Sequence, residues 1–588
     1  MMLGRKGWIV LGCVAGFLGL AAATDALMAR RPPPAPADAA PPLLLQQGWS
    51  SDMRDQFYYT TQGSRLMPLA FLKALEQPGN AGLFLDPGHI AATGFLPADG
   101  PSRNNPDLLP IGFARDGASD GAFGPMVGLT CAACHTSDIK VGAARIRIDG
   151  GASLGDFQLL MRRLSRALDA TLAQPAKFRR FAARLGADPK AVRPALEAVA
   201  ADIRRLEAAS WTPVAYGRGR LDAFGHILNA VAAEALAEPA NFRIPDAPVS
   251  YPFLWTTPAQ RYVQWNGVAG NPLGRNLGEV LGVFGHPSFA NGQLAAATST
   301  TALDNLVALE AWVAQLKPPP WPQKELGRPS AAKARRGAEL FKAHCAGCHG
   351  GPDYRLTPAA ETEGGRQWLA VTMVDLATVK TDPKMLTNFA GRTARPGALA
   401  PLLKPVTLPD GQVPAGQLLL AAVYTITENA LRARNITGDE RKAYYGWRFA
   451  PEPPPAPGAP PPRPQQGWTR SLAYKAGPLA GVWATGPFLH NGSVPTIYDL
   501  LSPEAERPKT FLVGAQRFDP KKLGFVSTAE DLPEAERAGL FVFDTRLPGN
   551  SNAGHAFPDP AVAVLSPQDR FAIIEYLKIL EGPDVSRH

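Results

Sequence analysis

Cysteine is scarce in this sequence, with five among 588 residues, and four of the five lie in two short motifs. The motifs read CAACH at 131–135 and CAGCH at 345–349. The two halves of a four-cysteine zinc ribbon lie within about 15–20 residues of each other, so the wide separation in this chain excludes that site. Neither motif follows a strand-like apolar run, which argues against a thioredoxin-like redox pair.

Long basic runs are also missing. The chain has 60 lysines and arginines against 51 aspartates and glutamates, which gives a formal net charge of +9. That charge is modest for a chain of this length and is typical of a solvated surface. We therefore expect no nucleic-acid partner.

Methionine is also scarce, with nine in the chain and none after Met385. The last part of the sequence therefore offers no thioether that could bind a metal. Histidine is the strongest ligand left in that part of the chain.

The two motifs themselves carry the clearest chemistry. Cys-x-x-Cys-His is the covalent attachment signature of c-type haem. Two thiols one helical turn apart can bind the vinyl groups of the haem, while the adjacent histidine is the proximal ligand of the iron. We therefore expect two haem c groups, one held by Cys131, Cys134 and His135, the other by Cys345, Cys348 and His349.

The amino terminus is consistent with export. Residues 1–29 contain Arg5 and Lys6 and then the apolar run GWIVLGCVAGFLGLAAA, which includes the fifth cysteine, Cys13. Its length and basic flank fit either a cleaved signal peptide or a retained membrane anchor. Both would place the rest of the chain in the periplasm.

Proline marks the expected domain boundaries. Proline-rich segments at 30–44 and 317–324 read as a tether and a stiff connector. They separate an N-terminal domain, 45–316, from a C-terminal domain, 325–588, each with one haem motif. We expect a mainly α fold of two class I cytochrome c-like domains with helical and loop insertions.

Local patterns predict the helices around the second motif. Ser330 is an N-cap candidate for a helix that ends just ahead of Cys345. Ser566 and Pro567 are the N-cap and first residue of a closing helix within 566–582, which is expected to pack across the first. Two further helices are predicted at about 154–175 and 190–209, as a helical subdomain enclosing the first haem.

The sixth ligand of the second iron is expected in the loop PGNSNAGHAFPDP, where His555 is the one strong ligand. His490, in GPFLHNGSVPT, is the competitor, or else a residue that orients the pocket. For the first iron, His89, His226 and His286 are candidates, but each fits a structural role better. The first iron is therefore expected to keep an open position.

The order of these segments resembles the bacterial di-haem cytochrome c peroxidase superfamily, which includes the MauG type. The shared elements are the two haem motifs, a Trp-Asn-Gly at 265–267, the proline-rich joint and GPFLHNGSVPTIYDLL. The segments SNAGHAF and GLTCAACHTSDIKVGAARIRIDGG look closer to the branch that contains the haem-dependent rubber oxygenases.

This resemblance implies roles for particular residues. Trp265 falls on a tryptophan that relays electrons between the two haems, with Trp255 as the alternative, and His555 matches a distal histidine. Glu279 is the nearest acid to the position where family members move protons, although it could instead pair with Arg275 four residues earlier. Calcium lies between the domains of peroxidase relatives, so it is a further candidate cofactor.

The favoured function is peroxide reduction at the first haem, with electrons passed through the second from a periplasmic electron-donor protein. One alternative is an O2-activating oxygenase like the rubber oxygenases. The other is a non-enzymatic di-haem electron carrier, which would keep both irons six-coordinate.

Overall fold

The computed structural model describes residues 41–117, 121–270, 272–358, 367–445, 472–556 and 565–583. The predicted signal or anchor segment, 1–29, and most of the tether that follows it lie outside these residues. Within them, no helix is both long and apolar enough to cross a membrane.

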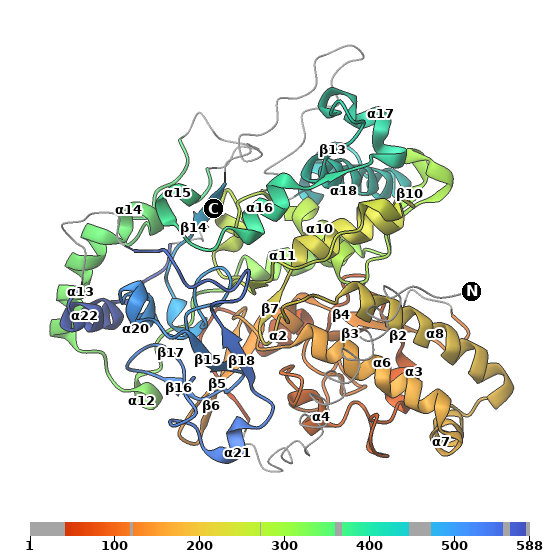
Figure 1. Cartoon of the computed structure of the whole chain (residues 1–588), viewed down its shortest axis with the longest axis horizontal. Helices are drawn as coiled ribbons and strands as arrows, with labels where there is room; N and C mark the ends of the chain where they lie inside the picture. Colours follow the sequence, from red (N-terminus) through yellow and green to blue (C-terminus); the bar gives the residue numbers. More distant parts are fainter. Residues whose placement is uncertain are drawn as a thin grey trace, which may run out of the picture.

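Helices hold more residues than strands do, but short strands pair in eight small sheets among the described residues, so the fold is mixed rather than mainly helical (Figure 1). The helices of the first half are α2 (Ser51–Tyr59), α3 (Leu69–Ala74), α4 (Pro87–Ala91), α5 (Cys131–Cys134), α6 (Phe157–Ala173), α7 (Pro175–Leu185), α8 (Pro189–Ala209), α9 (Ala223–Leu228), α10 (Pro272–Gly282) and α11 (Leu303–Val313). Those of the second half are α12 (Gln323–Leu326), α13 (Ala331–His344), α14 (Ala346–His349), α15 (Leu376–Val379), α16 (Lys384–Gly391), α17 (Ala400–Leu403), α18 (Ala415–Ala433), α19 (Gly438–Tyr444), α20 (Ile497–Leu500), α21 (Glu534–Arg537) and α22 (Pro567–Leu577).

The sheets have two or three strands each. One three-stranded sheet has the order β1 (Leu43–Leu44), β6 (Ala144–Asp149), β5 (Thr136–Val141), and the other has the order β2 (Met67–Pro68), β4 (Met126–Leu129), β3 (Phe113–Asp116). The antiparallel pairs are β7 (Arg220–Leu221) with β8 (Val249–Ser250), β9 (Ser288–Phe289) with β10 (Ala297–Thr298), β11 (Thr372–Asp375) with β14 (Ala473–Ala476), β12 (Thr393–Ala394) with β13 (Val413–Pro414), β15 (Thr510–Val513) with β18 (Phe541–Asp544), and β16 (Phe518–Asp519) with β17 (Gly524–Phe525).

The helices predicted around the second motif are confirmed. Ser330 caps α13 by accepting a hydrogen bond from the backbone of Lys333, and Ser566 caps α22 in the same way. The two helices cross closely, because a Cβ added to Gly337 would lie 1.9 Å from the carbonyl oxygen of Ala572. Glycine is needed at this crossing, which brings α13 and α22 together as predicted.

The helices predicted near 154–175 and 190–209 are also confirmed, as α6 and α8. With α3 and α7 they enclose a hydrophobic core of their own, which includes Phe71, Leu164, Phe181 and Leu196. Figure 1 shows this group at the lower right, away from α13 and α22.

The two halves of the chain share the main hydrophobic core. Leu277 of α10 belongs to the same buried cluster as Leu418 of α18 and Trp483. Trp255, fully buried, donates a 2.8 Å hydrogen bond from Nε1 to the carbonyl oxygen of Ala480. The predicted connector at 317–324 therefore joins two halves that interlock.

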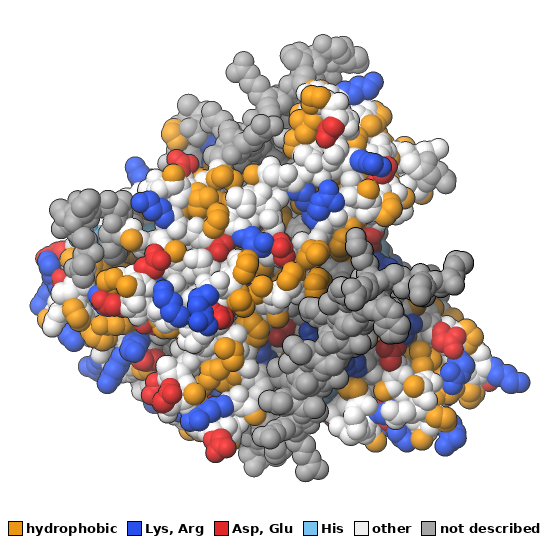
Figure 2. Space-filling model, in the orientation of Figure 1, with side chains coloured by type: hydrophobic (Ala, Val, Ile, Leu, Met, Phe, Trp, Pro, Cys, Tyr) orange, Lys and Arg blue, Asp and Glu red, His pale blue; other side chains and the backbone are white. Residues whose placement is uncertain are grey.

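The surface matches the modest net charge. Figure 2 shows Lys and Arg side chains interspersed with Asp, Glu and apolar side chains on the visible face. The positive charge is not gathered into one field on this face.

Candidate functional site

The two motif histidines are held in the same way. His135 donates a 2.7 Å hydrogen bond from Nδ1 to the carbonyl oxygen of Pro252, and His349 donates one of 2.8 Å to that of Gly477. Burial lowers the pKa of His135 to about 4 and also lowers that of His349, so both rings are neutral at physiological pH. A neutral imidazole fixed at Nδ1 presents Nε2 as a metal ligand.

The four motif cysteines form no disulfide bonds. Thr130 caps the single-turn helix α5 by accepting from the backbone of Ala132, so that Cys131 and Cys134 lie one turn apart. Burial raises the pKa of the Cys131 thiol to about 12. These groups fit a c-type haem, since thiols and a proximal nitrogen are present together in each motif.

A second histidine faces the second motif. The ring centroids of His349 and His555 lie 6.2 Å apart, with their planes at 53°. An imidazole nitrogen binds a metal at about 2 Å, and the ring centre lies about 1 Å behind it, so two rings on opposite sides of one metal ion should have centroids about 6 Å apart. The described geometry therefore fits a haem iron held between His349 and His555.

His490 lies elsewhere. Its ring stacks on that of Tyr474 with a centroid distance of 4.1 Å, and its Nε2 lies 2.9 Å from the Tyr474 hydroxyl. Burial lowers its pKa to about 3. These contacts engage His490 in a buried hydrogen-bonded pair, which matches the pocket-orienting alternative better than iron ligation.

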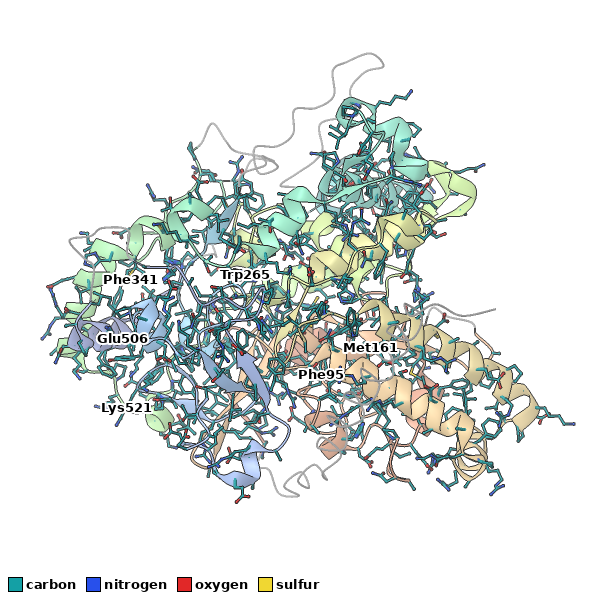
Figure 3. The ribbon with its side chains drawn as sticks, viewed as in Figure 1. Phe95, Met161, Trp265, Phe341, Glu506 and Lys521 are labelled. Atoms are coloured by element: carbon teal, nitrogen blue, oxygen red, sulfur yellow. The ribbon has the colours of Figure 1, made fainter. Side chains whose placement is uncertain are left out.

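Trp265 contacts the segments that hold both proximal histidines. Its Nε1 donates a 3.0 Å hydrogen bond to the carbonyl oxygen of Ser250, two residues before Pro252. Its own carbonyl accepts a 2.8 Å hydrogen bond from the backbone of Lys475, two residues before Gly477. Figure 3 shows Trp265 near the centre of the molecule, between Phe341 on one side and Met161 on the other.

Glu279 lies on α10, close enough to the first motif for its charge to raise the pKa of both Cys131 and Cys134. Gln264 donates a 2.6 Å hydrogen bond to its Oε1. Burial raises the pKa of Glu279 to about 7, against the opposing effect of the Arg275 charge. A half-buried carboxyl group of this pKa can take and return a proton near neutral pH.

The expected alternative, a pair between Glu279 and Arg275, is not the ion pair that the structure shows. Arg275 instead donates a 2.6 Å hydrogen bond to Glu310 of α11. Glu310 also accepts from Asn276. Arg275 is therefore engaged across helices, and Glu279 is held by Gln264.

The three candidate distal histidines of the first site have other partners. His89 packs edge-on against Phe84, His226 packs against Phe157, and the Nε2 of His286 lies 2.6 Å from the carbonyl oxygen of Arg65. Among the described rings, the one in contact with His135 is Tyr251. The two sites therefore differ, because the histidine pairing of the second site is not repeated at the first.

No group of three or more His, Cys, Asp or Glu side chains that could hold a metal ion occurs within the described ranges. Three contributors were missed by sequence reasoning. Pro252 and Gly477 act through backbone carbonyls, which leave no mark in the sequence, and Gln264 acts through an amide on a loop 15 residues before Glu279. The nearness of Gln264 to the Trp-Asn-Gly segment is the one signal that could have singled it out.

Comparison with known proteins supports a cytochrome. Residues 473–512, which include Gly477 and His490, match the family described as RoxA-like, cytochrome c-like. The chain therefore contains a cytochrome c-like domain, which implies a c-type haem with iron and is consistent with a haem oxidoreductase.

Two relatives come from Sinorhizobium fredii. The uncharacterized protein y4iJ is 33% identical over 594 aligned positions, covering 91% of this chain and 93% of y4iJ. The uncharacterized protein y4iM is 44% identical over 84 positions, which is 14% of this chain and 19% of y4iM. The chain belongs to the same family as y4iJ.

Proposed function

We propose that this protein is a periplasmic di-haem oxidoreductase with two unequal iron sites, which reduces peroxide at the first site with electrons passed through the second. The observation that carries the proposal is the contrast between the sites. His349 faces His555, whereas the cysteines of the first motif lie within reach of the charge of Glu279, a carboxyl group whose pKa is raised to about 7. A site with two histidine ligands is suited to electron transfer, and an open site is suited to binding a small molecule.

The residues of the first site supply proton transfer. Reduction of hydrogen peroxide to two water molecules consumes two electrons and two protons, and a bound haem would supply the redox chemistry. Glu279 can accept a proton from one peroxide oxygen and return it to the other. Gln264 keeps the carboxyl group in one orientation during this exchange.

Trp265 supports electron transfer between the sites. It is hydrogen-bonded to the segment that ends at Pro252 and to the strand that leads to Gly477. Its ring also lies in an edge contact with His490, with centroids 6.5 Å apart. Trp265 is therefore linked through short bonded segments to both proximal histidines.

The partner that supplies electrons would be a periplasmic redox protein. Export is supported by the apolar segment that follows Arg5 and Lys6 and by the haem motifs, since haem is attached to such motifs outside the cytoplasm. The segment would act as a signal peptide or as an anchor.

Optical and EPR spectra of the purified holoprotein, before and after addition of hydrogen peroxide, test the proposal. We expect one high-spin and one low-spin haem and a rapid change on adding peroxide. Two low-spin haems that do not respond to peroxide, in either the oxidised or the half-reduced protein, would overturn it and leave an electron carrier.

A second candidate function is supported by the match to the RoxA-like family. In that case the first site would bind O2 and oxidise an organic substrate without an external electron donor. A stable oxygenated spectrum before any peroxide is added would favour this function over peroxide reduction.

A further inference from the structure

The described part of the loop that carries His555, up to residue 556, has no helix or strand after β18, yet its backbone makes several hydrogen bonds to distant segments. The carbonyl oxygen of Ser551 accepts a 3.0 Å hydrogen bond from Asn491. The backbone N–H of His555 donates one of 2.8 Å to the carbonyl oxygen of Val379. The loop is therefore fixed by long-range contacts and not by regular structure.

Arg507 makes the closest set of these contacts. It is 3% exposed, and its guanidinium donates to the carbonyl oxygens of Asn552 and Gly554, the latter at 2.8 Å. It also donates to the carbonyls of Leu500 and Ser502. The described ion pairs do not include Arg507, so its forked donors all serve backbone carbonyls.

The backbone at Gly554 and His555 adopts the left-handed conformation. Gly554 and His555 have φ angles of 72° and 50°. A Cβ at Gly554 would lie 2.3 Å from the carbonyl oxygen of Val379. The left-handed conformation is costly for a residue with a side chain, and it persists only where surrounding contacts enforce it. Arg507 provides such contacts one residue before His555.

The ring of His555 is not oriented in the way the proximal rings are. His135 and His349 are each fixed by a hydrogen bond from Nδ1. The Nδ1 of His555 is buried and has no hydrogen-bond partner within the described part of the chain. The orientation of this ring therefore depends on its backbone, which is held by Arg507, by the carbonyl of Val379 and by Glu504 Oε2, which accepts a 3.3 Å hydrogen bond from the N–H of Gly554.

We propose that Arg507 is the positioning residue of the second haem site: its bonds to Asn552 and Gly554 aim His555 at His349, and its buried charge favours the reduced form of an iron held between them. This inference rests on the proposed ligation of iron by His555. A cation beside the site favours the reduced form because reduction removes one positive charge from the iron.

The experiment compares variants of the full-length holoprotein. Arg507→Gln removes the charge and most donors, and Arg507→Lys keeps the charge without the forked donors. His555→Ala serves as the reference for loss of the ligand. Arg570→Gln is the matched control, because Arg570 is also 3% exposed but bonds Ser502 and Glu506 at 2.8 Å instead of the His555 loop.

The readouts are the low-spin EPR signal of the second haem, its midpoint potential and the thermal unfolding temperature. We expect Arg507→Gln to lose most of the low-spin signal and to lower the potential, with added imidazole restoring the signal. In Arg507→Lys, the midpoint potential should change little because the charge is kept. The low-spin signal should fall more, because the forked donors that hold the loop are lost. Arg570→Gln should keep both while lowering the unfolding temperature.

The two levels of inference fail differently. If His555→Ala loses the low-spin signal but Arg507→Gln changes only the unfolding temperature, Arg507 is structural and the positioning role is wrong. If His555→Ala keeps the signal, iron ligation by His555 fails, and the role of Arg507 fails with it. Should Arg507→Gln not fold, Gly554→Ala displaces the same loop, and an unchanged low-spin signal in that variant would overturn the proposal.

Discussion

Gln264 donates a 2.6 Å hydrogen bond to Glu279, from a backbone position in the left-handed region with a φ angle of 67°. The bond joins the loop that carries Trp265 to helix α10. Residues proposed for electron transfer and for proton transfer are thus neighbours in one hydrogen-bonded unit. The expected effects of replacing Gln264, Glu279 or Trp265 depend on this hydrogen-bonded unit.

Replacing Gln264 by Leu should shift the pH dependence of peroxide turnover. The hydrogen bond from Gln264 lowers the pKa of Glu279, so its loss raises that pKa above about 7. Turnover that needs the carboxylate rises with pH through the pKa of Glu279, and the rise should therefore move to higher pH by about one pH unit. Steady-state rates measured across pH would show this shift. An unchanged pH profile would mean that Gln264 has no influence on peroxide turnover.

Glu279→Gln should slow peroxide turnover by about 10²-fold to 10⁴-fold, since the amide cannot carry a proton between the peroxide oxygens. Stopped-flow spectra of the first haem after mixing with peroxide would measure the effect. Glu428→Gln is the control, because Glu428 is a half-buried acid that pairs with Arg441 away from the motifs. Full turnover in Glu279→Gln would remove the proton-transfer role.

His490→Ala should leave the second haem low-spin. The ring of His490 is engaged by Tyr474, and the ring that faces His349 belongs to His555. EPR of the oxidised protein checks this expectation. A switch to high spin in His490→Ala, with His555→Ala unaffected, would reverse the two assignments.

Trp265→Phe should slow the arrival of electrons at the first haem without preventing its initial reaction with peroxide. The substitution keeps an aromatic ring but removes the indole N–H that bonds Ser250. Single-turnover experiments with the prereduced protein would follow both haems. Trp255→Phe is the comparison, since Trp255 stacks on Phe253 and bonds Ala480 instead. Slowing by Trp255→Phe alone would make Trp255 the relay.

Gly337→Ala should destabilise the protein by about 1–3 kcal/mol, the usual cost of overpacking. The added methyl would overlap the carbonyl of Ala572 where α13 crosses α22. Thermal unfolding followed by circular dichroism measures the loss. Gly391→Ala, in a position where an added Cβ meets nothing within 4 Å, should be neutral or slightly stabilising. Equal melting temperatures for both variants would contradict the close crossing.

Structural features that depend on residues close together in the sequence could be predicted from the sequence. Ser330, Ser566 and Pro567 mark the starts of α13 and α22 correctly because capping acts over three or four residues. The ion-pair partner of Arg275 could not be predicted in this way. The sequence spacing suggested Glu279, one helical turn from Arg275, as its partner. In the folded chain, the guanidinium of Arg275 instead donates a 2.6 Å hydrogen bond to Glu310 Oε2 of α11.

Contacts between distant segments carried no sequence signal. The carbonyls of Pro252 and Gly477 act without their side chains, and the bonds of Arg507 likewise end on backbone oxygens. Any residue type could supply such an oxygen, so composition and spacing do not predict which residue accepts the hydrogen bond. Some of the short strands have the same origin, since β1 pairs with β6 and β11 pairs with β14 about a hundred residues further along the chain.

The bonds that fix the two motif histidines suggest an order of events in the maturation of the proposed haem sites. His135 meets its carbonyl 117 residues later in the sequence, and His349 meets its own 128 residues later. Under the proposed export, each thiol pair and its histidine would emerge before the segment whose carbonyl holds the imidazole. Haem attachment would then meet an open motif, and folding would close over the inserted group in each half in turn.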